Sequence, residues 1–151
     1  MEWRQWIALL CSVQVHGALT IQCLWKVAVS FELSMQTARG IAEEWCGAWN
    51  RRDLDAVMAH YAEDVAFSSP TVVRRWGIAD GWLYGRTWLR ENFAIGIAAD
   101  SLDFDLIGVV TGVMSMCIIY RRETGLLVTD TVEFDESGKA LRVVACYGTK
   151  P

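Results

Sequence analysis

Apolar residues recur at helical spacing at the start of the regularly patterned part of the chain. Ile41, Trp45 and Trp49 lie four residues apart, so they share one face of a predicted helix. Asp53 can cap a second, short helix. The buried side of that helix is predicted from the i, i+3, i+4, i+7 spacing of Leu54, Val57, Met58 and Tyr61.

The period changes to two after this second helix. Val65, Phe67 and Ser69 alternate along the chain and point one way from a predicted strand that ends at Pro70. The following segment, 70–84, contains two glycines and two tryptophans. This composition predicts a loop lying over an apolar surface.

A third helix is predicted to open at 85–87, with Thr87 as its cap. Leu89, Phe93 and Ile97 repeat every four residues along its buried face. Beyond residue 100 the pattern predicts four β-strands, over 102–111, 113–122, 126–134 and 140–147. No β-α-β repeat occurs in this half of the chain, so the sheet is expected to be antiparallel and strongly curved.

Two short turns set the expected register of the sheet. A two-residue turn at 124–125 pairs Ile119 with Asp130, and a hairpin centred on 136–137 pairs Asp130 with Val143. One face then carries a largely apolar set: Cys117, Ile119, Arg121, Val128, Asp130, Val132, Phe134, Val143, Ala145 and Tyr147. The opposite face is too apolar to lie bare in water, which predicts a homodimer through the convex face of the sheet.

Composition and charge narrow the choice of partners. The chain has 151 residues, enough to bury a core in one domain, and a net charge of −4 with acidic and basic residues interspersed. A nucleic-acid partner is therefore not expected. The five cysteines form no Cys-x-x-Cys pair, and His16 and His60 have no further ligands at metal spacing. No metal site is predicted.

Residues 1–34 do not fit this pattern. Between Gln5 and Trp25 the chain carries no charged side chain and is rich in Trp, Ile, Leu and Val. Three interpretations are open: an over-extended reading frame with Met35 as the natural start, a membrane anchor or export signal, or an extra docked helix. A cytoplasmic location follows from the first, and membrane contact is expected only if the leader is real.

The order of these elements over residues 36–148 resembles the NTF2-like superfamily, which includes the SnoaL-like polyketide cyclases and the ketosteroid isomerases. The most specific likeness is the sequence TDTVEFDESG at 129–138, which looks like the isomerase strand that carries a catalytic acid, here Asp130. The resemblance implies an α+β fold, a cone-shaped barrel with three N-terminal helices packed on a curved antiparallel sheet. It also implies one deep apolar pocket, a homodimer and no cofactor.

Asp130 is an ionisable group set within the apolar strand face. Burial without a partner disfavours the charged form and raises the pKa. A neutral carboxylic acid can then donate a hydrogen bond to an oxyanion or shuttle a proton. The alternative is an ion pair with Arg121, which would lower the pKa of Asp130. Trp45, Ser69 and Phe93 replace three functional positions of the isomerases, so steroid isomerisation by that mechanism is not expected.

Two functions remain open. The first is an enzyme, with Asp130 as catalytic acid or base in isomerase, cyclase or hydrolase-type chemistry on a small apolar cyclic compound. The second is a non-catalytic small-molecule-binding or dimerisation module of the same fold. In both, the pocket is predicted to be lined by Trp45, Trp49, Tyr61, Phe67, Ser69, Phe93, Arg121, Val143 and Tyr147.

Overall fold

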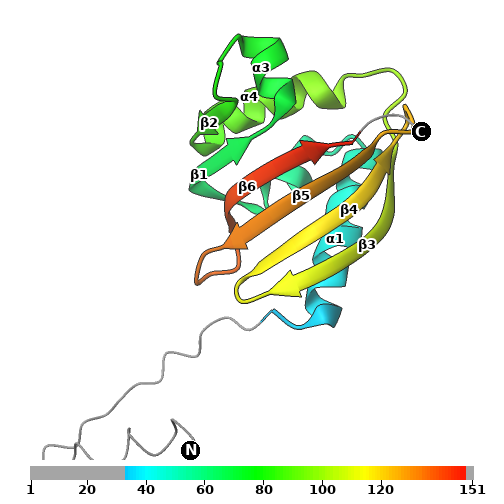
Figure 1. Ribbon diagram of the computed structural model, residues 1–151, viewed down its shortest axis with the longest axis vertical. Helices are drawn as coiled ribbons and strands as arrows, with labels where there is room; N and C mark the ends of the chain where they lie inside the picture. Colours follow the sequence, from blue (N-terminus) through cyan, green and yellow to red (C-terminus); the bar gives the residue numbers. More distant parts are fainter. Residues whose placement is uncertain (1–32, 149–151) are drawn as a thin grey trace, which may run out of the picture.

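The computed structural model describes residues 33–148 (Figure 1). The three interpretations of the leader concern residues 1–34, of which 1–32 lie outside this range. At the N-terminal end of the described range, Leu33 is buried against the core. The Ser34 hydroxyl accepts a hydrogen bond from the Thr37 N–H at 3.1 Å and caps the first helix. Within residues 33–148, no helix is both long enough and apolar enough to cross a lipid bilayer.

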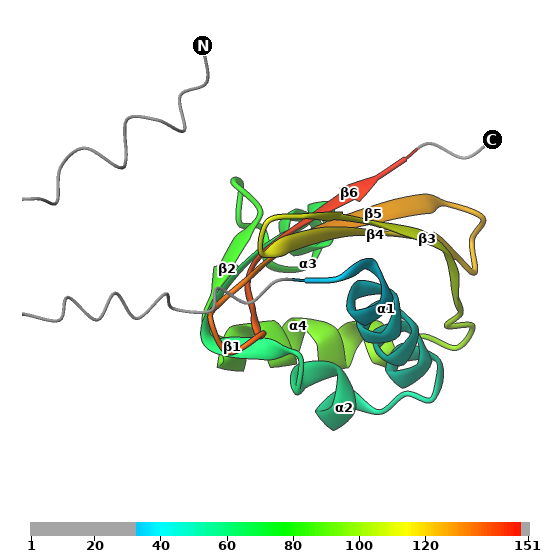
Figure 2. The same cartoon turned by 90° about the horizontal axis from the view of Figure 1, so that it is seen from below.

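The described residues form an α+β fold, as predicted, with four helices where three were expected. In chain order the elements are α1 (Met35–Asn50), α2 (Leu54–Met58), β1 (Tyr61–Ser68), α3 (Pro70–Trp76), β2 (Trp82–Tyr84), α4 (Arg86–Ile97), β3 (Phe104–Gly112), β4 (Ser115–Arg122), β5 (Leu127–Phe134) and β6 (Ala140–Tyr147). Figure 2 shows α1, α2 and α4 on one side of a curved sheet. The opposite, convex face of the sheet carries no helix from the described residues.

One strand pair departs from the antiparallel expectation. The sheet has the order β2-β1-β6-β5-β4-β3. Its neighbours are antiparallel except for β1 and β6, which run parallel. A parallel pair needs a long connection between its strands. Here two helices and four strands lie between β1 and β6 in the chain, so the absence of a β-α-β repeat did not exclude this pairing.

The helix predictions hold in part. The Asp53 carboxylate accepts a hydrogen bond from the Ala56 N–H at 3.0 Å, which confirms the predicted cap of α2. Tyr61 does not extend this helix; it is buried as the first residue of β1. Thr87 does not cap α4, because Gly85 occupies the cap position and no side chain bonds there.

The segment expected to be a loop contains α3 and β2. The Ser69 hydroxyl accepts a hydrogen bond from the Thr71 N–H at 3.1 Å, and Pro70 is the first helical residue. Gly77 ends the helix with a left-handed φ of 69°, and its N–H donates to the Val73 carbonyl. A proline at the start and a glycine after the end are typical helix signals, so the prediction weighted the glycines and tryptophans too heavily.

The β4–β5 turn is one residue longer than predicted. The Arg122 N–H donates to the Leu126 carbonyl at 2.9 Å, and the Gly125 N–H donates to the Arg122 carbonyl at 2.8 Å. Gly125 has a φ of 81°, which is typical of a three-residue hairpin loop. As a result Ile118, not Ile119, lies opposite Asp130.

A shift of one residue exchanges the two faces of a strand. Ile119 and Arg121 therefore lie on the convex face with Cys117, while Tyr120 and Arg122 face the helices. Arg121 is exposed and donates to the Gly125 carbonyl at 3.3 Å. The β5–β6 register differs by two residues from the prediction, with Ala145 opposite Asp130. A shift of two residues leaves each side chain on its predicted face.

Asn50 joins the end of α1 to the edge strand β3. Its Nδ2 donates to the Phe104 carbonyl at 3.1 Å, and its Oδ1 accepts from the Phe104 N–H at 2.8 Å. Both backbone groups of one edge-strand residue are thus satisfied by a side chain instead of a neighbouring strand. This bond pair also fixes the position of the Phe104 ring.

Replacement of Asn50 by alanine is expected to lower the free energy of unfolding by about 1–2 kcal/mol, because two hydrogen bonds to the strand are lost. Urea denaturation measures this change. Glu43→Ala, on the same helix, removes only an exposed ion pair with Arg39 and should cost less than about 0.5 kcal/mol. Equal losses in the two variants would contradict a specific role for Asn50.

Candidate functional site

Asp130 lies in the middle of β5, facing the helices. It is 4% exposed, between the buried side chains of Val128 and Val132 on the same face. The Tyr120 hydroxyl donates a long hydrogen bond to Asp130 Oδ1 at 3.5 Å, from the neighbouring strand β4. None of the ion pairs formed within residues 33–148 includes Asp130.

The surroundings of Asp130 disfavour its negative charge. Burial raises the pKa of Asp130 to about 7, although the Tyr120 hydrogen bond and the positive charge of Arg122 act in the opposite direction. The ion pair with Arg121, which would have lowered this pKa, is not formed because Arg121 lies on the convex face. Near neutral pH the carboxyl group is therefore present in both protonation states.

Three tyrosines accompany this acid. Burial and the nearby Asp130 charge together raise the pKa of Tyr61, Tyr120 and Tyr147, so all three phenols are neutral at physiological pH. The Tyr61 hydroxyl accepts a hydrogen bond from the Trp45 indole N–H at 3.0 Å. The phenols are therefore available as neutral hydrogen-bond donors near Asp130.

A cavity adjoins Asp130 on the helix side of the sheet. Its enclosed space is about 40 Å³, and about 440 Å³ when the solvent-filled mouth is included. The walls come from α1, β1, α3, α4 and the strands β3 to β6: Trp45, Trp49, Phe67, Thr71, Arg75, Asn92, Phe93, Gly96, Phe104, Tyr120, Arg122, Asp130, Ala145 and Tyr147. The enclosed part holds only a few water molecules.

Aromatic rings account for the small enclosed volume. Trp49 stacks on Phe104 with 5.1 Å between ring centroids and meets the edge of Phe93 at 5.0 Å. Phe104 also stacks on Tyr120 at 4.9 Å. Trp45 lies edge-on to Tyr120 at 5.5 Å. The interior of the cone is thus largely filled by these rings.

A second, smaller cavity of about 20 Å³ lies beside the first. Both cavities are lined by Trp45 and Asp130, so these two side chains separate them. His60 and Tyr61 line only the second cavity. The Asp130 carboxyl group is consequently accessible from two sides of the core.

The structure distributes the nine predicted pocket residues over five places. Trp45, Trp49, Phe67, Phe93 and Tyr147 line the larger cavity, and Tyr61 lines the second. Ser69 is buried behind the cavity wall, where its hydroxyl is hydrogen-bonded at 2.8 Å to the hydroxyl of Thr71, a residue that lines the larger cavity. Val143 is buried in β6 without lining either cavity, and Arg121 lies outside on the convex face.

The sequence analysis missed five polar residues of this cavity: Thr71, Arg75, Asn92, Tyr120 and Arg122. Tyr120 and Arg122 would have been found from the three-residue form of the turn at Gly125. Arg75 was hidden in the segment taken for a loop. Asn92 lies between the buried residues Leu89 and Phe93 of α4. Because it is polar, the pattern of apolar residues did not indicate that it is buried.

Arg122 is already paired at the rim of the cavity. Its Nε donates to Glu123 Oε2 at 2.8 Å and its Nη2 to Oε1 at 3.0 Å. Its guanidinium also lies 4.6 Å from the centroid of the Phe104 ring. Among residues 33–148, no group of three or more His, Cys, Asp and Glu side chains is arranged to hold a metal ion.

Comparison with known proteins identifies relatives through structure. No protein-family model matches the sequence, and no curated protein matches it significantly. Two solved structures share the fold at low identity. One is a cystatin-like fold protein of unknown function from Methylobium petroleophilum, with 15% identity over 80% of this chain and 81% of that one, and a TM-score of 0.62. The other is an NTF2-like protein of unknown function from Cytophaga hutchinsonii, with 14% identity over 74% and 90% and a TM-score of 0.58.

A third structure is a more similar protein. It is a SnoaL-like protein of unknown function from Burkholderia thailandensis, with a TM-score of 0.70 and 30% sequence identity. The alignment covers 78% of this chain and 99% of that relative. The level of identity over nearly the whole relative shows common ancestry and not only a shared fold, and the chain belongs to the SnoaL-like proteins of the NTF2-like superfamily.

Proposed function

We propose that this SnoaL-like protein is a cofactor-independent acid–base enzyme that acts on a small, largely apolar carbonyl compound. The observation that carries the proposal is the buried Asp130 carboxyl group, which has no cationic partner at ion-pair distance in residues 33–148 and adjoins a cavity. A structural carboxylate in such a position would be paired or exposed. A carboxyl group with a pKa near 7 is suited to proton transfer at physiological pH.

The proposed chemistry uses both states of Asp130. The carboxylate removes a proton from the carbon next to the carbonyl group, and the neutral acid returns a proton at another atom of the substrate. Once Asp130 has taken up the proton, the single O–H of the neutral Tyr120 phenol can turn from Asp130 and donate a hydrogen bond to the developing enolate oxygen. Isomerase- and cyclase-type reactions share this proton transfer from carbon, whereas in a hydrolase-type reaction the carboxylate would take the proton from an attacking water molecule. The aromatic walls favour a flat or cyclic substrate.

The enclosed volume supports a second candidate function, a non-catalytic binding module. An enclosed space of about 40 Å³ is small for a cyclic substrate. In this case Trp45, Trp49 and Phe93 would serve as core, and the mouth of the cavity would capture a ligand without transforming it.

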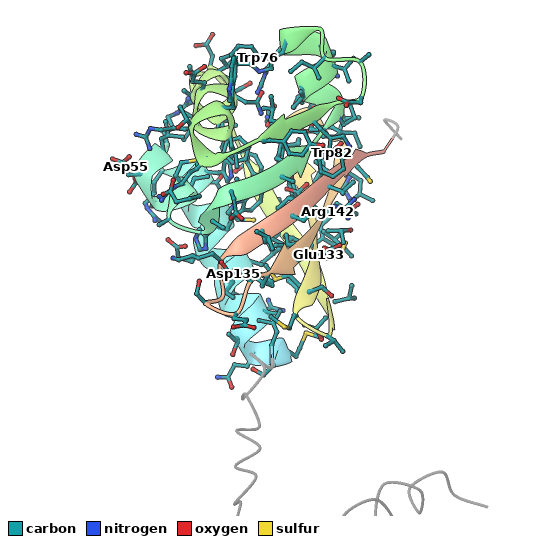
Figure 3. All side chains as sticks on the ribbon, turned by 90° about the vertical axis from the view of Figure 1, so that its left-hand side faces the viewer. Asp55, Trp76, Trp82, Glu133, Asp135 and Arg142 are labelled. Atoms are coloured by element: carbon teal, nitrogen blue, oxygen red, sulfur yellow. The ribbon has the colours of Figure 1, made fainter. Side chains whose placement is uncertain are left out.

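We also propose a homodimer through the convex face of the sheet. Val110 is 55% exposed in β3. Val110 lies opposite Cys117 of β4, and Ile119, two residues further along β4, is on the same face. Arg142 forms the polar end of this face (Figure 3). Its guanidinium carbon lies 4.9 Å from the centroid of the Trp82 ring, and its Nη1 pairs with Glu133 Oε1 at 3.1 Å. An apolar centre with a polar rim is typical of protein interfaces.

Exchange of protons next to a carbonyl group tests the enzymatic proposal. In D₂O at pH 7, the protein is expected to accelerate deuterium incorporation into cyclopentanone or cyclohexanone, and Asp130→Asn should slow it by about 100-fold or more. Proton NMR follows the loss of the α-proton signals. Glu133→Gln is the matched control, because Glu133 lies on the same strand but is exposed on the convex face. Equal rates for wild type and Asp130→Asn would favour the binding module.

The raised pKa of Asp130 also predicts a pH-dependent stability. Because the folded protein binds this proton more tightly than the unfolded chain, ionisation of Asp130 destabilises the fold as the pH rises from about 4 to about 7. Between pH 4 and pH 8, wild type should lose stability relative to Asp130→Asn by an amount on the order of 4 kcal/mol. Urea denaturation of both proteins at the two pH values measures this difference. A constant difference would mean that Asp130 has an ordinary pKa.

The dimer is tested with two valines of the same hairpin. Val110→Glu puts a charge in the proposed interface and should convert the dimer to a monomer at micromolar concentration. Val113→Glu is the control, because Val113 is 93% exposed at the tip of the hairpin. Sedimentation velocity distinguishes the two states. A monomeric wild type, or dissociation by both variants, would refute an interface on this face.

A further inference from the structure

The mouth of the larger cavity gathers hydrogen-bond donors. Asn92 is 1% exposed on α4. Its Oδ1 accepts hydrogen bonds from Arg75 Nη1 at 3.0 Å and from the Trp76 indole N–H at 3.3 Å. Guanidinium and indole nitrogens can only donate, so the accepting atom is the amide oxygen. None of these three hydrogen bonds uses the amide nitrogen Nδ2 as a donor.

Trp49 supplies a second donor of this kind. Trp49 is buried, with 5% of its surface exposed. Its indole N–H has no hydrogen-bond partner within residues 33–148. Buried donors in folded proteins almost always have a partner. Since Trp49 lines the cavity together with Asn92, a molecule in the cavity is the natural source of the missing acceptor.

Arg75 adds a positive charge to these two donors. Its Nη1 donates to the carbonyl oxygen of Asn92 at 2.8 Å as well as to the amide oxygen, which fixes the guanidinium at the cavity mouth. No carboxylate pairs with Arg75 in the described residues. Partial burial lowers the pKa of Arg75, but a guanidinium remains charged at physiological pH. Arg122, the other cation of the cavity, is already paired with Glu123.

Gly96 brings the guanidinium and the indole to the same point. A methyl group at Gly96 would lie 3.4 Å from Arg75 Nη2 and 3.5 Å from Cζ3 of Trp49. Both side chains therefore border the space over this glycine. The indole atom at this point is Cζ3, on the opposite side of the ring from the N–H, so the contact places the Trp49 ring and not its N–H beside Arg75.

We propose that this mouth binds the carboxylate group of a small monocarboxylic acid, with Arg75, Asn92 and Trp49 as its recognition residues. A carboxylate matches the site because its oxygens accept several hydrogen bonds and carry the charge opposite to that of Arg75. The carbon skeleton of the ligand lies on the Asp130 side of the cavity, and the aromatic side chains must move apart to admit a ring. The inference deepens the proposed acid–base function by naming the class of substrate, an acid whose carbonyl or ring reaches Asp130.

The test compares a charged probe with its neutral analogue. Benzoate has a flat ring and a carboxylate, and benzamide keeps the shape without the charge. In ¹H–¹⁵N spectra of the full chain, benzoate is expected to shift the Trp49 indole N–H signal on binding, with an affinity at least about tenfold higher than that of benzamide. Equal affinities, or benzoate binding that leaves the Trp49 signal unchanged, would overturn the assignment.

Two adjacent arginines provide a matched pair of variants. Arg75→Gln should weaken benzoate binding by at least about tenfold. Arg74 is the preceding residue of α3, and its side chain does not line the cavity. Arg74→Gln removes the same charge and should change the benzoate affinity by less than about twofold. Equal weakening in both variants would mean general electrostatic attraction and would overturn the site. Arg75→Lys keeps the charge without the two-pronged donor geometry, and intermediate affinity is expected.

The carboxylate site and the acid–base function can fail separately. Asp130→Asn should abolish proton exchange, and Arg75→Gln should weaken benzoate binding, so the two functions are read out by different variants and different measurements. Binding of benzoate without any proton exchange by wild type would keep the site and remove the enzyme. Proton exchange without benzoate binding would keep the enzyme and overturn the carboxylate site.

Discussion

The left-handed backbone at Gly125 decides which side chains meet Asp130. With a three-residue turn, Ile118 lies opposite Asp130, and Tyr120 and Arg122 face the helices. With a turn one residue shorter, Arg121 would occupy that face and would pair with the acid. The chemistry of the interior thus depends on a local conformation that glycine adopts without steric cost. The pKa of Asp130 is raised by burial, and the turn keeps Arg121 on the opposite face, where it does not pair with the acid.

The sequence predicted the large-scale organisation well because burial produces strong periodicity. Trp45, Trp49 and Phe93 are buried on the predicted helix faces, and β6 begins and ends where expected. The strand that carries Asp130, and its orientation toward the core, also followed from period-two alternation. These features depend on many residues at once, so an error at one position does not change them.

The errors occurred where one residue determines the geometry. The length of the turn at Gly125, the helix after Pro70 and the parallel pairing of β1 with β6 each depend on contacts that periodicity does not encode. The recognition residues Arg75 and Asn92 belong to the same class, because they lie on different helices, separated by β2, and meet only in the folded protein. Sequence analysis therefore located the acid but not the donors at the mouth of its cavity.

The parallel pair of β1 and β6 has a consequence for the order of folding. β1 is the first strand of the described chain and β6 the last, yet they are neighbours in the sheet. The hairpins β3–β4 and β4–β5 join neighbouring segments and do not need β6, whereas β1 gains its central partner only after nearly the whole domain has been synthesised. Until then α1 and β1 have no completed sheet on which to bury their aromatic side chains. The N-terminal half of the domain is therefore expected to depend on the C-terminal strand for its stability during biosynthesis.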